Sequence, residues 1–87
     1  PDEVNTPAKQ IYFALQTAYI GTDEERQSAL VRARELIEQF KEATTSALAR
    51  EILDRALECA KSDDCYEALK LSRRIMRHEA AVLQSCQ

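Results

Sequence analysis

The chain has 87 residues, of which 31% are charged, and a formal net charge of −3, with one glycine and two prolines. This length allows one domain, and the abundance of strong helix formers such as Ala, Leu, Glu and Arg predicts an all-α fold. The negative net charge argues against a protein that coats nucleic acid with a generally basic surface, because long-range attraction to phosphate would be weak.

Cysteine and histidine usage gives no sign of a disulfide framework or a metal site. The three cysteines, Cys59, Cys65 and Cys86, are odd in number and form no Cys-x-x-Cys pair, which suits a reducing compartment. The spacing of His78, the single histidine, to these cysteines fits no zinc pattern. The longest apolar run, residues 11–15, is too short to span a membrane. We therefore expect a cytoplasmic protein without membrane contact, metal or cofactor.

The first helix is predicted to start with Thr6 as N-cap and Pro7 as its first residue, where the N–H that proline lacks would have no intrahelical partner. Gly21, the single glycine, is expected to end this helix in the left-handed conformation. Residues 1–5 are expected to be a frayed end. Apolar and aromatic residues occupy nearly all sides of this helix, which predicts a central place in the core or an external partner.

Two further helices follow. Thr22 and Glu25 form a capping box for a second helix that runs to about Ala43. The hydroxyl residues 44–46 interrupt the helical pattern before a third helix that runs to about Lys61. In both helices apolar residues recur at intervals of three and four, and the remaining positions carry charges of mixed sign. Each helix is therefore expected to bury one stripe and expose the other.

Asp64 and Glu67 resemble an acidic capping box and predict the start of the last helix, which is expected to run to about Gln84. Connections as short as these place successive helices side by side and antiparallel. The sequence therefore predicts an all-α, compact bundle of about four helices joined by short turns, in a single domain over residues 6–87.

The last helix carries two apolar lines where one would suffice for a core. The second line includes Ala68, Leu71, Ile75 and Val82. We expect the first helix to bury this line by packing across it, and the alternative is burial by another subunit or a partner chain.

Four cations gather on the last helix. Lys70, Arg74 and Arg77 share one face at i, i+4 and i+7, and Arg73 flanks them. Arginine offers a planar fork of donors that suits phosphate oxygens. An ordinary solvated face has the same composition, since cations in the C-terminal half of a helix also complement its dipole.

Aromatic rings stack on unpaired bases in proteins that bind single-stranded RNA, and this chain has such rings at Tyr12, Phe13 and Tyr66. Their apolar neighbours favour a place in the core instead. His78 is expected on the surface, paired with an acid. The sequence contains no nucleophile with a base and no glycine-rich loop. Its adjacent carboxylates, at 24–25 and 63–64, fall at helix starts, where the dipole stabilises anions. We therefore expect no enzymatic activity and no catalytic residue.

Two stretches together resemble a family signature. Residues 6–19 match the pattern Thr-Pro-Ala-Lys-Arg-Ile-Tyr-x-Ala-x-Gln-x-x-Tyr at every fixed position except Gln10. Residues 65–79 resemble Phe-Tyr-Lys-Ala-Leu-Lys-x-x-Arg-x-Leu-Ile-x-Tyr-Glu and keep Tyr66, Ala68, Leu69, Lys70, Arg73 and Glu79, whereas Cys65, Glu67 and His78 depart from it. On these stretches the chain resembles the FlbT family of flagellar biosynthesis regulators.

The resemblance implies a non-enzymatic regulator of flagellum biogenesis that acts after transcription. Such a protein would bind the 5′ untranslated leader of flagellin mRNA and promote decay of the message or repress its translation. Members of this family carry a β-rich segment of roughly fifty residues, the size of a small domain, before the first motif. The chain is therefore expected to be the C-terminal helical part of a longer protein.

Two sets of site residues follow. Phosphate contacts with RNA are expected from Lys70, Arg73, Arg74 and Arg77, with Lys9 as a further contributor. The alternative is a protein-interaction module that binds flagellin, a FlaF-like flagellin export chaperone or a second copy of the chain. The side chains expected to contact such a partner are Tyr12, Tyr19, Leu71, Ile75 and Val82.

Overall fold

A computed structural model describes the backbone of residues 6–85 and the side chains of residues 6–81. Within this part, the chain forms four α-helices and no strand. The helices are α1 (Pro7–Ile20), α2 (Asp23–Ala43), α3 (Ala47–Lys61) and α4 (Cys65–Ser85). The predicted all-α bundle of four helices with short connections is confirmed. The expected frayed end, residues 1–5, lies outside the described residues.

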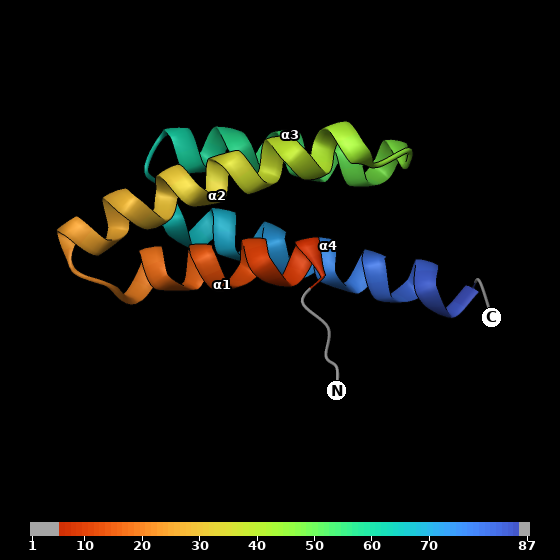
Figure 1. Cartoon of the computed structure of the whole chain (residues 1–87), viewed down its shortest axis with the longest axis horizontal. Coiled ribbons are helices and arrows are strands. Elements are labelled where there is room, and N and C mark those ends of the chain that lie inside the picture. The colour runs from red at the N-terminus through yellow and green to blue at the C-terminus, as the bar shows by residue number, and fades with distance from the viewer. Residues whose placement is uncertain (1–5, 86–87) are drawn as a thin grey trace.

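Successive helices run antiparallel, and α4 closes the bundle by packing against α1 (Figure 1). In the described part of the chain the backbone of each helix approaches its two neighbours closely, and the backbones of the diagonal pairs stay further apart. The result is two layers, with α2 and α3 above α1 and α4 in the view of Figure 1. The radius of gyration of 12.5 Å matches the value of about 12 Å expected for a folded chain of this length.

The predicted N-caps Thr6, Thr22 and Asp64 are present, and Ser46 is a further N-cap that was not predicted. Thr6 Oγ1 accepts the N–H of Lys9 at 3.3 Å. Thr22 and Glu25 exchange two hydrogen bonds, of 3.3 and 2.8 Å, as a complete capping box. Ser46 Oγ accepts the N–H of Ala49 at 3.1 Å, and Asp64 Oδ1 accepts the N–H of Glu67 at 3.3 Å. These local bonds explain why the helices begin where the sequence indicates.

Gly21 ends α1 but does not adopt the predicted left-handed conformation. Its φ of −86° and ψ of 176° lie in the extended region, which any residue can adopt. Glycine is needed here for space, because a Cβ atom would lie 2.7 Å from the carbonyl oxygen of Thr17 and 2.9 Å from Cβ of Glu25. The missing side chain lets α1 and α2 meet in a tight hairpin.

The left-handed residue is instead Asp63, with φ of 67°, in the turn between α3 and α4. The Asp63 N–H donates to the carbonyl of Ala60 at 3.3 Å, and the Asp64 N–H donates to the carbonyl of Cys59 at 2.8 Å. This pair of bonds is a Schellman motif, which satisfies the last carbonyls of α3. The usual residue at its left-handed position is glycine, so Asp63 carries a conformational cost here.

The core lies between the two layers and is rich in small side chains. Its largest fully buried apolar residues are Ile11, Leu15, Ile37, Leu53 and Ile75. Eight alanines from all four helices are also buried, namely Ala8, Ala18, Ala29, Ala33, Ala49, Ala56, Ala60 and Ala68. Because alanine lets helix axes approach closely, this composition is typical of tightly packed bundles.

The second apolar line of α4 faces this core. Ala68, Leu71 and Ile75 are buried, with Ile75 fully inaccessible to solvent, and α1 packs against α4. Burial of these three residues inside the bundle is therefore confirmed. Burial by the first helix is not, because the contacts of α1 are with Tyr66 and Arg73, and His78, on the same face as Leu71, contacts the start of α3. The side chain of Val82 lies outside the described residues.

Candidate nucleic-acid interface

The four cations predicted on the last helix all lie on the surface of α4. The Lys70 ammonium lies 3.2 Å from the Glu67 carboxylate, and this hydrogen bond, with the charge of Glu67, raises the pKa of Lys70. In the described part of the chain, no carboxylate forms an ion pair with Arg73, Arg74 or Arg77. These three guanidinium groups are therefore available to an anionic ligand.

Arg73 and Arg77 share a shallow pocket with an aromatic ring of α1. The Arg73 guanidinium lies 5.8 Å from the centre of the Tyr12 ring, within the range of a cation–π contact. The pocket measures about 380 Å³, and Met76 and Ala80 complete its lining. Cations and a half-buried aromatic ring thus meet between two helices that are distant in sequence.

A second aromatic group lies further along the same two helices. The rings of Tyr19 and Tyr66 are 5.8 Å apart, and Lys70 Nζ lies 5.2 Å from the centre of the Tyr66 ring. Both tyrosines expose about half of their surface, at 51% and 56%. Ring faces at this end are therefore accessible to solvent.

The two groups form one continuous strip, which we call the α1–α4 seam. It comprises Tyr12, Tyr19, Tyr66, Lys70, Arg73 and Arg77. Tyr12 and Tyr19 are seven residues apart, as are Tyr66 and Arg73, so that antiparallel α1 and α4 keep register. Seven residues of helix separate the two groups by about 10 Å along the axis.

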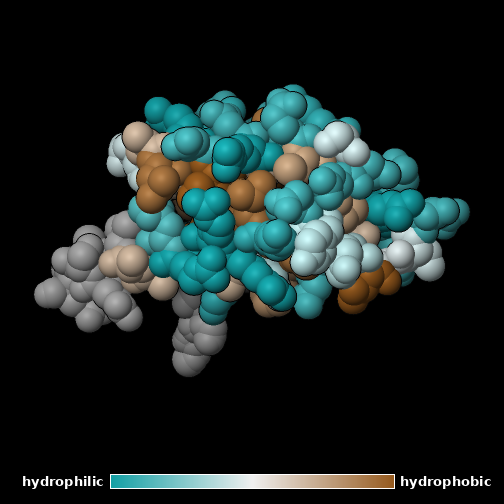
Figure 2. All heavy atoms as spheres, turned by 180° about the vertical axis from the view of Figure 1, so that it is seen from behind, coloured by the Kyte–Doolittle hydropathy of each residue, from teal (hydrophilic) through white to brown (hydrophobic). Residues whose placement is uncertain are grey.

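Charge is distributed unevenly between the layers. Helices α1 and α4 together contain five lysines and arginines and two acids, whereas α2 and α3 contain seven lysines and arginines and nine acids. Seen from behind, the surface is mostly hydrophilic, and its apolar residues gather mainly in the upper part of the view (Figure 2). The seam is thus a locally positive strip on a protein whose net charge is negative.

Two of the predicted RNA contacts are not part of the seam. Arg74 is exposed beside Arg73, and Lys9 lies half-buried in the first turn of α1. Neither makes a cation–π contact in the described part of the chain. The structure therefore brings together Lys70, Arg73 and Arg77 with aromatic rings, and leaves the other two as flanking cations.

Of the residues predicted to contact a protein partner, some are at the surface and others are buried. Tyr12 and Tyr19 reach the surface at the seam, whereas Leu71 and Ile75 are buried. The latter two side chains are not presented to a partner, because they lie inside the core of the bundle. The reverse correction applies to Phe13 and Tyr66, which were expected in the core and are more than half exposed.

His78 was expected to pair with an acid and instead contacts Ser46. Its Nε2 atom lies 3.0 Å from Ser46 Oγ, the same hydroxyl that caps α3. The contact joins the C-terminal half of α4 to the start of α3. Ser46 Oγ accepts the Ala49 N–H at the same time, so this hydroxyl both caps α3 and links it to α4.

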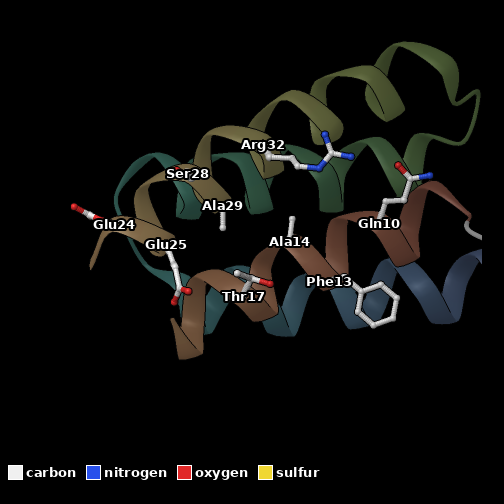
Figure 3. A pocket seen from close by; sticks show the side chains of 9 residues that line it. All are labelled: Gln10, Phe13, Ala14, Thr17, Glu24, Glu25, Ser28, Ala29 and Arg32. Atoms are coloured by element: carbon white, nitrogen blue, oxygen red, sulfur yellow. The ribbon is translucent and has the colours of Figure 1, made fainter. Parts of the chain in front are cut away.

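Sequence reasoning missed a larger groove between α1 and α2 (Figure 3). It has a volume of about 640 Å³. Its lining residues are Gln10, Phe13, Ala14, Thr17, Glu24, Glu25, Ser28, Ala29 and Arg32. The signal that could have found it is the outer side of α1, where Phe13, Thr17 and Ile20 follow one another without a charge.

No helix in the described range is both long and apolar enough to cross a membrane. The same residues contain no cluster of three or more potential metal ligands.

The sequence model of the flagellar protein FlbT family matches residues 1–83. The chain belongs to the FlbT family. No curated protein and no solved structure shows significant similarity to it. The two stretches that resemble the FlbT signature lie on α1 and α4, which pack against each other. Tyr12, Tyr19, Tyr66, Lys70 and Arg73 all belong to these FlbT stretches and all lie at the seam.

Proposed function

We propose that this FlbT-family chain is a non-enzymatic, cytoplasmic regulator of flagellum biogenesis that acts after transcription. It binds the 5′ untranslated leader of flagellin mRNA along the α1–α4 seam, and it promotes decay of the message or represses its translation. The observation that carries the proposal is the alternation of tyrosine rings with Lys70, Arg73 and Arg77 on one strip.

The chemistry of the seam favours unpaired RNA. Arg73 and Arg77 have no competing carboxylate among the described residues and can bind phosphate oxygens. Tyr19 and Tyr66 offer ring faces on which bases stack, which requires bases that are not already stacked in a duplex. A strip that combines both features follows a single strand along its backbone and contacts a few of its bases.

Decay of the message would require a recruited nuclease. The Ser46–His78 contact is the arrangement in the described residues closest to a nucleophile with its base, and Ser46 is engaged as the cap of α3. In this proposal the chain binds the leader, and a recruited nuclease cleaves it.

The decisive experiment measures binding of a fluorescent flagellin leader RNA at two salt concentrations. Arg73→Ala combined with Arg77→Ala is expected to weaken binding by at least about tenfold, that is 1.4 kcal/mol. The slope of log affinity against log salt should fall by about 1.4, since each contact with a single strand contributes about 0.7.

A matched control removes two exposed cations from α3, Arg55→Ala with Lys61→Ala, and changes the net charge equally. It should alter affinity less than about twofold, because exposed charges beyond a Debye length of about 8 Å are screened at physiological salt. Equal losses in the two double variants would reduce the seam to a general charge effect and refute the proposed site.

A second candidate function is a protein-interaction module that binds flagellin, a FlaF-like export chaperone or another copy of the chain. The observation that favours it is the α1–α2 groove with the exposed Phe13 at its side. Pull-down of purified flagellin or the chaperone, with and without Phe13→Ala, separates this function from RNA binding.

A further inference from the structure

The groove between α1 and α2 has a floor of small side chains beside an exposed aromatic ring. Ala14, Thr17, Ser28 and Ala29 line its middle, and Phe13 stands at its edge (Figure 3). Phe13 is 53% exposed although phenylalanine gains free energy from burial. The surface thus offers an apolar side chain and, next to it, a hollow that such a side chain can fill.

The outer side of α1 differs from an ordinary solvated helix face. Phe13, Thr17 and Ile20 are exposed at i, i+4 and i+7, Ile20 to 73%, and none of them is charged. The cores of protein interfaces are depleted in charge and enriched in aromatic residues. This face therefore has the composition of a contact surface.

The two ends of the groove carry opposite charges. Glu24 lies in the first turn of α2, near the α1–α2 turn, and Arg32 lies eight residues further along α2 (Figure 3). Eight residues of helix span about 12 Å. A two-fold axis through the middle of the groove would bring Glu24 of one chain opposite Arg32 of a second chain, and the reverse, since such an interface is self-complementary.

We propose that two copies of this chain associate through their α1–α2 grooves as an isologous dimer. Helix α1 of one copy lies antiparallel to α1 of the other, and each Phe13 packs over the small residues of the opposite groove. Two Glu24–Arg32 ion pairs close the ends. A second copy is the occupant that these features favour, because one chain supplies the aromatic ring, the groove that receives it and both charges of the ion pairs. The dimer does not depend on RNA binding, although the Phe13 ring contacts the seam residue Tyr12 edge-on, with ring centres 5.6 Å apart.

The test is a charge exchange read by sedimentation velocity. The wild-type chain is expected to dimerise with increasing concentration. Each of two single variants, Arg32→Glu and Glu24→Arg, places like charges opposite each other at both ends of the two-fold interface. Either variant should therefore weaken self-association by at least about tenfold. An equimolar mixture of the two variants should form heterodimers of near wild-type affinity, because both ion pairs are then restored with reversed polarity.

Glu24 is chosen over Glu25 because Glu25 belongs to the capping box of α2. Circular dichroism checks that both variants fold, and Phe13→Ala provides a third variant that should also be monomeric. The control pair Arg55→Glu and Glu58→Arg on α3 should dimerise as the wild type does. A wild-type chain that stays monomeric at concentrations up to about 1 mM overturns the proposal. So do single variants that dimerise normally, or a mixture that remains monomeric.

Discussion

The two sides of α1 show how one helix can serve two surfaces with different chemistry. Toward α4 it presents Tyr12 and Tyr19 to a strip of cations, and toward α2 it presents Phe13 and Thr17 to a groove floored by alanine and serine. The first side suits an anionic, stacking ligand, and the second suits an apolar side chain. Both depend on the same buried edge, which includes Ile11 and Leu15. A helix that is apolar nearly all round is therefore explained by a core edge with a functional surface on either side.

The largest expected effect is a loss of stability on truncation of a large side chain in the core. Ile75→Ala should lower the free energy of unfolding by about 2–5 kcal/mol, because truncation of a fully buried isoleucine leaves a cavity in the core. Urea denaturation followed by circular dichroism measures this change. Tyr66→Ala, on the exposed side of the same helix, is the control and should cost less than about 1 kcal/mol. Equal, small losses would mean that Ile75 is a surface residue after all.

Gly21→Ala tests the geometry that closes the groove at the α1–α2 turn. The new methyl group would meet the Thr17 carbonyl at 2.7 Å, and a backbone atom cannot move aside cheaply. We expect a loss of about 1–3 kcal/mol in unfolding free energy, as in other overpacked sites. Thr22→Gly, which removes the capping side chain of the same turn but leaves a residue that is accepted at N-caps, should cost less. A neutral Gly21→Ala variant would contradict the steric role given to this glycine.

The two sides of α1 should be separable by a pair of aromatic truncations. Tyr66→Ala should weaken binding of leader RNA by about 1–3 kcal/mol, the usual contribution of one stacked base, and leave dimerisation unchanged. Phe13→Ala should have the opposite pattern. Fluorescence anisotropy and sedimentation velocity on both variants give four values. If either variant impairs both activities by a similar factor, the two surfaces are not independent.

Much of this arrangement could be predicted from the sequence because it depends on local physics. Helix starts follow from the hydroxyl and carboxylate side chains of Thr6, Thr22, Ser46 and Asp64, which bond backbone groups three residues away. The buried stripes follow from spacing along each helix. The burial of Leu71 could also have been predicted, because a helix with two apolar lines needs one neighbouring helix to bury each line.

The remainder depends on contacts between helices. Phe13 and Tyr66 are apolar enough for a core, and only the direction from which α2 and α4 approach α1 decides that they stay outside. The His78–Ser46 contact joins residues 32 positions apart, and the groove is a gap between two helices that no single stretch encodes. Gly21 and Asp63 show the same limit on a small scale, since the conformations of both turns were predicted wrongly or not at all.

The smallest expected effect separates stability from both surfaces. Asp63→Gly places the residue preferred for a left-handed conformation in the Schellman turn between α3 and α4, and should stabilise the fold by about 0.5–1 kcal/mol. The substitution also removes a carboxylate 4.0 Å from Arg26 Nε, a distance too long for a strong pair. A change of this size shifts the melting temperature by several degrees in a domain this small. RNA affinity and dimerisation should stay unchanged, because the turn contributes no residue to the seam or to the groove. If stabilisation at this remote turn also altered either activity, the losses seen in the Tyr66 and Phe13 variants could no longer be assigned to their own sides of α1.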